Sequence, residues 1–440
     1  MTELITSDGS IHYRLFYDKL GNIIEAEDLI QKTTTKRSYT HFGELLEETQ
    51  SNRLTTKRTY DPIGRKIALS LPNQSQVEYT YDPYHLKEIR RIDPSGTPLY
   101  EHHYNTYDLS HNLLSETLIK EQGEVEHKID LLNRTIQTIS PHFKEKMTAF
   151  DPNGNLLKYH RDHTSLEFAY DDLDQLINET GTFTHSYTYD SHHNRIQKDD
   201  SPYNHNTLHQ LLQTDQIEFA YDLNGNLISE ETDTKKISYE HDGLDRLAAI
   251  YMPNYVYRFY YDYWNRLTRE QIQVLQNGRW VVGKEEDYLY DELNELGAYP
   301  KQLRILGQGH GAEIGAAVAI EIRNKIYLPL HDLFGNVIGL LDPEKEKLVE
   351  TYTYSSFGEE KETDTFINPW HYQSKRQIEH LVYFGRRFYH PEIGRWITTD
   401  PKGYEEGINL YQYLLNNPFG HFDLYGLEVE ESRRGFGTFF

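Results

Sequence analysis

The chain carries a repeat of about twenty residues, marked by a tyrosine followed by an aspartate. Several neighbouring pairs, such as Tyr60-Asp61 and Tyr81-Asp82, are 20 or 21 residues apart. A fixed period of this kind indicates a repeat architecture and constrains the fold more than any single residue does. The clear members are Tyr60-Asp61, Tyr81-Asp82, Tyr107-Asp108, Tyr170-Asp171, Tyr189-Asp190, Tyr221-Asp222, Tyr261-Asp262 and Tyr290-Asp291.

Each repeat has the pattern of a β-hairpin. Apolar or aromatic residues alternate before the aspartate, as at Ile217, Phe219 and Tyr221, which is typical of a strand with one buried face. A turn such as 223–226 follows, in which Gly225 supplies a positive φ and the aspartate accepts backbone N–H groups. One hairpin is too small to be stable alone, so we expect each to bury its ring-bearing face by stacking on the next.

Composition narrows the function classes. The chain has 36 Tyr but only 3 Met, which favours half-wet β surfaces. Its formal net charge of −24 makes DNA or RNA an unlikely ligand. The absence of Cys excludes disulfides and thiolate zinc sites, and the histidines lie in turn-rich stretches without zinc-site spacing. We therefore predict no metal site and no cofactor. The histidines considered are His102, His103, His192, His193, His205 and His209.

Three repeat architectures are compatible with the period. A β-propeller would need about 40 to 45 residues per blade, but neighbouring repeats do not alternate between two kinds. A choline-binding solenoid would need Trp-lined cages, and the four Trp are not one per repeat. A continuous ribbon of strands remains. After Tyr290 the register breaks, 298–301 marks a boundary, and 302–330 predicts strands buried on both faces.

No part of the sequence predicts a membrane span or a Sec-type signal. Residues 1–20 lack a basic segment followed by an apolar run, and the longest apolar run, 314–320, is far too short to cross a bilayer. We expect a soluble protein that is cytoplasmic before delivery and is exported or secreted by another route.

The C-terminal stretch 384–427 contains the candidate chemistry. Asp400 and Asp423 each stand in a short D-x-x-G frame, and Arg387 lies a strand's length upstream of the first. Two carboxylates that share one proton can hydrolyse a peptide bond without a metal, and their proximity raises one pKa. Turn aspartates are also common structural caps, so the residues alone leave both interpretations open.

This stretch resembles the core of RHS-repeat proteins, also called YD-repeat proteins, a group that includes the C component of Tc toxins. The matching positions are 387–391, 394–395, 400–403, Gly407, Asn409, Tyr411, Tyr413, 417–418 and 423–427. His390 stands where the family usually has Asp, and Leu424 where it has the Pro of the second D-P-x-G motif. Loss of that proline frees the turn. The resemblance is loose over 1–300 and sharp over 326–427.

The resemblance implies an all-β fold in which hairpins form a coiled ribbon or hollow shell closed by a C-terminal core. It also implies an intrinsic aspartyl protease that cuts once, after the second motif. Asp400 and Asp423 would be the catalytic pair, Arg387 their supporting basic residue, and the cut would fall between Leu427 and Glu428. We accordingly expect a repeat segment at 1–300, a core at 301–427 and a tail at 428–440.

In that family the segment after the cut is a toxic domain held inside the shell. The tail 428–440 is too short to form a domain, so either a longer segment is missing or the chain is a reduced copy. The expected partners are its own or a missing C-terminal toxin segment, and a second shell-completing subunit or a secretion apparatus. A non-enzymatic shell or adhesion module remains the alternative, and a carbohydrate-binding repeat protein is a third hypothesis.

Overall fold

The computed structural model describes residues 1–361, 367–405 and 407–431. These residues form β-strands, turns and short 3-10 helices, and no α-helix occurs among them. The all-β prediction is therefore confirmed. None of the helices in this part of the chain has the length and apolar character that crossing a membrane requires.

The strands divide between two compact units. Unit 1 contains residues 1–104, 239–307 and 318–325, and unit 2 contains residues 105–238, 308–317 and 326–440. Each unit thus combines segments that are far apart in the sequence.

Strands up to residue 202 follow one another closely along the chain. They are β1 (Thr2–Ile5), β2 (His12–Tyr17), β3 (Ile23–Asp28), β4 (Thr33–Tyr39), β5 (Leu45–Thr49), β6 (Thr55–Tyr60), β7 (Lys66–Ser70), β8 (Gln76–Tyr81), β9 (Leu86–Ile92), β10 (Pro98–Tyr107), β11 (Leu113–Thr117), β12 (Glu124–Ile129), β13 (Thr135–Ile139), β14 (Lys144–Phe150), β15 (Leu156–Arg161), β16 (Thr164–Tyr170), β17 (Leu176–Thr180), β18 (His185–Tyr189), β19 (Arg195–Lys198) and β20 (Ser201–Pro202).

The later strands and the 3-10 helices complete the described elements. They are β21 (Asn204–His205), β22 (Leu211–Gln213), β23 (Glu218–Tyr221), β24 (Leu227–Glu231), β25 (Lys236–His241), β26 (Leu247–Tyr251), β27 (Tyr255–Tyr261), β28 (Leu267–Gln276), β29 (Arg279–Asp291), β30 (Asn294–Ala298), β31 (Gln302–Leu306), β32 (Ala317–Ile322), β33 (Lys325–His331), β34 (Val337–Asp342), β35 (Lys347–Thr351), β36 (Arg376–Ile378), β37 (Leu381–Tyr383), β38 (Phe388–His390), β39 (Arg395–Trp396), β40 (His421–Asp423) and β41 (Val429–Glu431), with η1 (Ile119–Glu121), η2 (Tyr372–Ser374), η3 (Gly403–Glu405) and η4 (Leu414–Asn416).

Consecutive strands pair antiparallel inside each unit, so the repeats form continuous ribbons as predicted. In unit 1, β5 pairs with β6 and β6 with β7, and in unit 2, β15 pairs with β16 and β16 with β17. The register shifts by one residue at the tyrosine of many repeats, for example at Tyr60 and at Tyr221. This bulge directs the chain into the turn that begins with the aspartate.

The repeat aspartates cap their turns, as predicted. Asp222 is typical: its Oδ1 accepts the backbone N–H of Asn224 (2.9 Å) and of Asn226 (2.8 Å). Its Oδ2 accepts the side-chain amide of Asn226 at 3.0 Å. Gly225 has the positive φ expected, at 90°. The residue four positions after the aspartate binds Oδ2 in the same way at Asn22, Arg65, Asn112, Arg134, Asn155, Gln175, Asn194, Asn226, Arg246, Arg266 and Asn336.

The repeat tyrosines join one repeat to the previous one. The Tyr60 hydroxyl donates to the carbonyl of Leu45, the first residue of β5, at 2.8 Å. Tyr189 reaches Leu176, the first residue of β17, at 2.9 Å. Because the hydroxyl finds a backbone acceptor, the ring can be buried without leaving a polar atom unsatisfied. The same contact recurs from Tyr39, Tyr81, Tyr261, Tyr290 and Tyr354.

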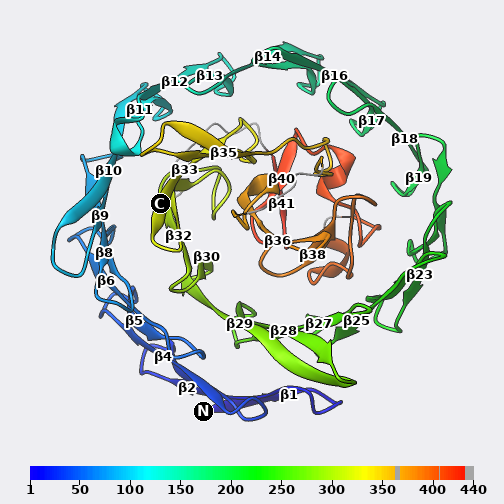
Figure 1. Ribbon diagram of the computed structural model, residues 1–440, viewed down its shortest axis with the longest axis horizontal. Coiled ribbons are helices and arrows are strands. Elements are labelled where there is room, and N and C mark those ends of the chain that lie inside the picture. Colours follow the sequence, from blue (N-terminus) through cyan, green and yellow to red (C-terminus); the bar gives the residue numbers. More distant parts are fainter. Residues whose placement is uncertain (362–366, 406, 432–440) are drawn as a thin grey trace. The chain divides into compact units, whose positions relative to one another are not determined.

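In unit 2 the C-terminal strands β36–β41 lie on the inner side of the curve that β12 to β23 describe (Figure 1). Aromatic residues of both segments share one hydrophobic core, in which Tyr187 contacts Phe357 and Tyr389 stacks on Tyr413 with ring centroids 3.9 Å apart. Burial of these rings holds the C-terminal segment against the repeats.

Polar contacts also attach the C-terminal segment to the repeat turns of unit 2. Asn409 donates to the side chain of Asn194 at 3.0 Å, and Asn417 donates to that of Asn155 at 2.9 Å. The Tyr411 hydroxyl donates to the carbonyl of Gly225 at 2.8 Å. Three of the positions that match the family, Asn409, Tyr411 and Asn417, therefore contact residues of the repeat turns.

Residues 302–330 include buried strands, as their continuous apolar pattern predicts. Ala319 and Ile320 on β32 are fully buried, and Leu328 on β33 is only 1% exposed.

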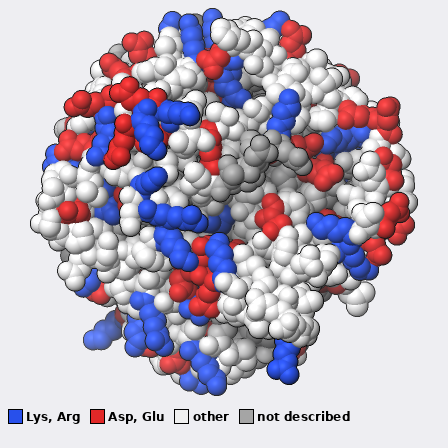
Figure 2. Space-filling model, viewed as in Figure 1, with Lys and Arg blue, Asp and Glu red and all other residues white. Residues whose placement is uncertain are grey.

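Exposed strand faces in other parts of the chain carry ion pairs such as Arg14–Glu3 at 3.0 Å and Arg90–Glu101 at 2.7 Å. Acidic and basic side chains are accordingly interspersed over the face drawn in Figure 2, despite the net charge of −24.

Candidate active site

Unit 2 brings together the three residues that the sequence singled out, Arg387, Asp400 and Asp423. Arg387 lies in the turn between β37 and β38, where its carbonyl accepts the N–H of Phe384 at 3.0 Å. Asp400 follows β39 and begins a turn that leads into η3. Asp423 is the last residue of β40. Three short elements therefore place one basic and two acidic side chains at a single point.

One guanidinium nitrogen faces both carboxylates. Arg387 Nη2 lies 2.8 Å from Oδ2 of Asp400 and 3.6 Å from Oδ2 of Asp423. Arg387 is only 2% exposed and Asp423 is fully buried. Charges removed from water in this way are tolerated when they are paired, so Arg387 offsets the cost of burying the two acids.

Backbone and ring contacts fix the orientation of Arg387. Its Nε donates to the carbonyl of Gly426 at 2.6 Å, and its guanidinium lies over the Trp396 ring, 4.2 Å from the centroid. Gly426 has a φ of 73°, and a Cβ at this position would come within 3.1 Å of the backbone nitrogen of Arg387. The second D-x-x-G frame thus needs its glycine for close approach to the arginine.

Asp423 combines turn capping with a raised pKa. Its Oδ1 accepts the backbone N–H groups of Tyr425 (3.1 Å), Gly426 (2.6 Å) and Leu427 (3.0 Å). Burial raises the pKa of Asp423, and this outweighs the opposite effects of Arg387 and of the N–H groups that include that of Glu428. The sequence argument attributed a raised pKa to the neighbouring carboxylate, whereas burial is the principal cause here.

Asp400 also caps its own turn, with Oδ1 accepting the N–H of Lys402 at 2.8 Å. A small cavity of about 10 Å³ lies beside it, lined by residues that include Asp400 and Val429. That is about the volume that one water molecule needs. Asp400 therefore adjoins a space of the right size for a single water next to the segment that follows Leu427.

The bond expected to be cut, Leu427–Glu428, lies in the turn that joins β40 to β41. The N–H of Leu427 is bound by Asp423, and Asp423 itself pairs with Val429 on β41. Glu428 pairs with Lys402 at 2.5 Å. The chain is therefore held on both sides of this bond. Residues 432–440 of the expected tail lie outside the described residues.

Leu424, which stands in place of the family's proline, has specific contacts. A Cβ on Gly311 would come within 2.9 Å of the Leu424 side chain, so Gly311 leaves room for it. Lys375 donates to the carbonyl of Leu424 and pairs with Glu313 at 2.7 Å. Packing and this lysine thus support the turn at a position where proline would restrict it directly.

Sequence reasoning identified the three charged residues but not all of their supports. Arg395 makes packing and turn contacts: it binds His205 at 2.6 Å and lies over Tyr411. The stacking of Trp396 on Arg387 and the contact of Lys375 with Leu424 were missed. No local pattern marks either contact, because each joins residues from different turns.

Comparison with known proteins agrees with this architecture. The model of the Teneurin YD-shell family matches residues 160–419, which is more than half of the chain. The chain belongs to this family. This chain is 27% identical over 278 residues to the tRNA3(Ser)-specific nuclease WapA of Bacillus spizizenii. The alignment covers 58% of this chain and 11% of the relative.

Toxin subunits of Yersinia entomophaga match as well. YenC2 is 46% identical over 44 residues, covering 10% of this chain and 4% of the subunit, and YenC1 is 26% identical over 159 residues, covering 36% and 13%. The YD-shell chain thus spans roughly a tenth of the length of its curated relatives. The solved TcdB2–TccC3–Cdc42 structure superposes with a TM-score of 0.50 at 17% identity, over 95% of this chain and 22% of that one, which shows a shared fold.

Proposed function

We propose that this YD-shell segment belongs to a toxin carrier and cuts its own chain once, between Leu427 and Glu428. The observation that carries the proposal is the placement of Arg387 Nη2 within 4 Å of Oδ2 of both Asp400 and Asp423. Asp423 at the same time binds the N–H of Leu427, one of the two residues that form the bond. A carboxylate pair and its peptide bond are thus neighbours in unit 2.

The pair can divide the chemistry between its members. The Asp400 carboxylate, which pairs with Arg387, takes a proton from a water molecule, and the hydroxide oxygen forms a bond to the carbonyl carbon of Leu427. Asp423, whose pKa is raised by burial, gives its proton to the nitrogen of Glu428 as the C–N bond breaks. The products are a carboxylate at Leu427 and an amine at Glu428. Because the step destroys its own substrate, each chain reacts once.

The proposed chemistry has a pH dependence that follows from Asp423. Its carboxyl must be protonated to act as the donor, so cleavage should slow as pH rises through its pKa, which lies above the usual value.

A non-enzymatic YD-shell is the second candidate, and the turn contacts favour it. Asp400 and Asp423 both cap their own turns through Oδ1, as Asp222 does in a repeat. In that case Arg387 would only neutralise two buried turn caps.

The experiment that separates the two candidates is the intact mass of the freshly purified chain and of matched variants. Cleavage predicts loss of residues 428–440 from the parent, with Asp400→Asn and Asp423→Asn at full length. Asp222 caps a repeat turn and is not one of the two carboxylates that face Arg387, so Asp222→Asn should be cleaved like the parent. A folded parent of full length would rule out the protease proposal and leave the non-enzymatic shell.

The partners follow from the family. Proteins similar to this chain are named as toxin subunits, and TccC3 is solved together with TcdB2. We therefore infer a second, shell-completing subunit or a secretion apparatus, and a C-terminal toxin segment as cargo. Co-purification of a TcdB2-like subunit with this chain would support the shell-completing subunit. Failure of the two chains to co-purify when both are present at micromolar concentrations would argue against it.

A further inference from the structure

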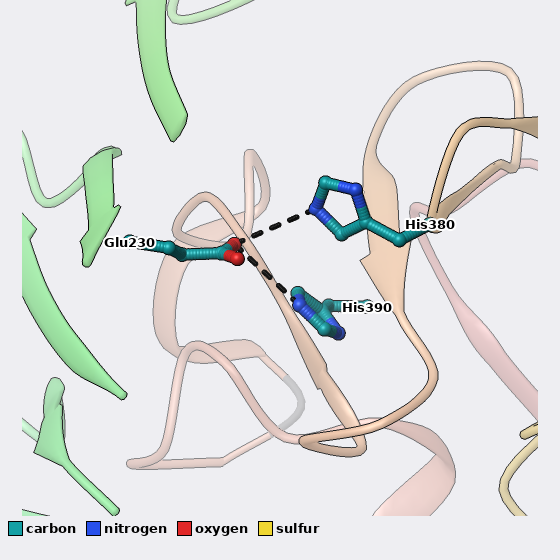
Figure 3. Close-up of side chains that lie close together, drawn as sticks. All are labelled: Glu230, His380 and His390. Carbon is teal, nitrogen blue, oxygen red and sulfur yellow. Dashed lines mark ion pairs between the residues drawn. The ribbon is translucent and has the colours of Figure 1, made fainter. Parts of the chain in front are cut away.

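Two histidines and one glutamate converge in unit 2, away from the candidate active site. Glu230 lies on β24, His380 in the two-residue turn between β36 and β37, and His390 at the end of β38. Figure 3 shows both imidazole rings with a nitrogen directed at the same carboxylate. Glu230 and His390 are buried, at 7% and 1% exposure, and the His380 side chain is 27% exposed.

The separations suit one metal ion. Oε1 of Glu230 lies 3.5 Å from Nε2 of His390 and 3.7 Å from Nε2 of His380. One ligand atom from each residue lies within 4.8 Å of each of the others. A tetrahedral ion with bonds of about 2.0 to 2.2 Å separates its ligands by about 3.3 to 3.6 Å. The two separations from Glu230 lie at or within a few tenths of an ångström of that range.

The ring of His390 is not committed to a hydrogen bond through its second nitrogen in the described chain. Its second ring nitrogen, Nδ1, is buried without a hydrogen-bond partner among the described residues, so no hydrogen bond there selects a tautomer. Coordination through Nε2 would place the proton on Nδ1 and orient the ring.

A second cluster in the described chain shows what a non-binding arrangement looks like. Glu88, Glu101 and His103 in unit 1 also lie within reach of one another, but all three are partly exposed. Arg90 lies between the two acids, at 2.8 Å from Glu88 and 2.7 Å from Glu101. A cation already neutralises that cluster. The carboxylate of Glu230, in contrast, lies against the imidazole rings of His380 and His390.

We propose that Glu230, His380 and His390 bind one divalent transition-metal ion of the zinc class, with the fourth position open beside the partly exposed His380. Imidazole nitrogen and carboxylate oxygen are ligands that such ions prefer, and three protein ligands plus water is a common set. The ion would tie β24 of the ribbon to the β36–β38 hairpin of the core, within unit 2. This proposal is independent of the carboxylate pair.

The test is a cobalt titration of the chelator-treated full chain, followed by visible absorption, with zinc as competitor. We expect one Co²⁺ per chain with the absorption bands of a four- or five-coordinate site, displaced by one equivalent of Zn²⁺. Replacing even an outer-shell partner commonly weakens metal binding 10- to 100-fold, so His380→Gln should weaken it by about 100-fold or more. His103→Gln, the matched control, should bind like the parent.

His380→Gln is the main variant because its side chain is partly exposed in a turn, and circular dichroism will check its fold. Glu230→Gln and His390→Gln test the buried ligands. As a second measurement, Zn²⁺ should raise the unfolding temperature of the parent and not that of His380→Gln. A folded parent without stoichiometric binding, or His380→Gln with unchanged affinity, would overturn the proposal.

Discussion

The aspartates of the repeat turns and those of the core turns share one contact and differ in the other. In both, Oδ1 accepts backbone N–H groups of the following turn, as at Asp222 and Asp423. In the repeat, Oδ2 is bound by the side chain four residues later, which is Asn226 for Asp222. In the core, Oδ2 of Asp423 faces Arg387 instead.

The residue four positions after the aspartate accounts for this difference. The residue four after Asp400 is Tyr404, and the residue four after Asp423 is Leu427, and neither carries an amide or a guanidinium. Their Oδ2 atoms are therefore left to Arg387, a residue outside both turns. The same kind of turn thus has both carboxylate oxygens bound within it when its fourth residue binds back, and leaves Oδ2 to Arg387 when it does not.

Removing the shared arginine should produce the largest effect. Arg387→Gln leaves two carboxylates without their cation in a buried site, which typically costs about 3 to 5 kcal/mol. We expect that loss in urea unfolding, together with loss of cleavage. Arg14→Gln, which breaks an exposed pair with Glu3, should cost no more than about 1 kcal/mol. Equal costs for the two variants would contradict the burial argument.

Glu145 extends the comparison to a buried acid whose nearby cation, Arg161, does not cancel the effect of burial. Its Oε2 accepts the Tyr159 hydroxyl, and burial, assisted by Asp332, raises its pKa to about 8 from an ordinary 4.5. The native state therefore holds a proton that the unfolded state releases. Its contribution to stability is full below about pH 4.5 and is lost as pH rises towards 8, by at most about 1.4 kcal/mol per pH unit.

Glu145→Gln should remove this pH dependence. Urea unfolding of parent and variant at pH 5, 6.5 and 8 measures it, and the variant should gain on the parent as pH rises. Glu48 provides the opposite sign: burial raises its pKa, but Arg266 at 2.8 Å, together with Arg37 and Arg58, outweighs burial, so the pKa is lowered. The ionised Glu48 therefore stabilises the parent near neutral pH, and the parent loses this stabilisation only in acid. Glu48→Gln should accordingly lower the free energy of unfolding near neutral pH. Parallel pH profiles for parent and Glu145→Gln would count against the raised pKa.

Tyr404→Asn tests whether the fourth residue separates the two kinds of turn. Tyr404 is 73% exposed, so the change should leave the fold intact. An asparagine there can bind Oδ2 of Asp400 and compete with Arg387, at about 1 kcal/mol for one hydrogen bond. We expect cleavage to slow by about tenfold in time-resolved intact mass, and Tyr404→Phe to leave it unchanged. Identical rates for the two variants would refute this explanation.

Removing the contact from the fourth residue to the aspartate in a repeat turn should have the smallest effect. Asn22→Ala removes the 2.9 Å bond from its amide to Oδ2 of Asp18, in a partly exposed turn. We expect a loss of about 1 kcal/mol in urea unfolding and no change in cleavage. A loss above about 3 kcal/mol would show that the repeat turns depend on this bond far more than the structure indicates.

The sequence predicted what local rules determine. Period-two alternation gave the strands, and each aspartate with its turn residues gave the caps, because these contacts join residues a few positions apart. The convergence of Arg387 with Asp400 and Asp423 came from a family resemblance. Neither spacing nor composition locates three residues of separate turns at one point.

The remaining features depend on contacts between distant segments. Asn409 binds Asn194, more than 200 positions earlier, so only the folded chain explains the asparagine of the core signature. The cluster of Glu230, His380 and His390 was missed for the same reason, since its glutamate lies on a repeat strand with no histidine nearby in sequence. Burial, which sets the pKa of Asp423, likewise follows from packing rather than from pattern.

The tyrosine hydroxyl that reaches back to the first residue of an earlier strand also limits how such a chain can evolve in length. Tyr60 meets Leu45 and Tyr189 meets Leu176 because each repeat keeps its strands in step. A gene duplication or deletion of one whole repeat preserves every such contact on both sides of the join. A change of a few codons within a strand would break one of them, so these ribbons are expected to lengthen and shorten in steps of a complete repeat.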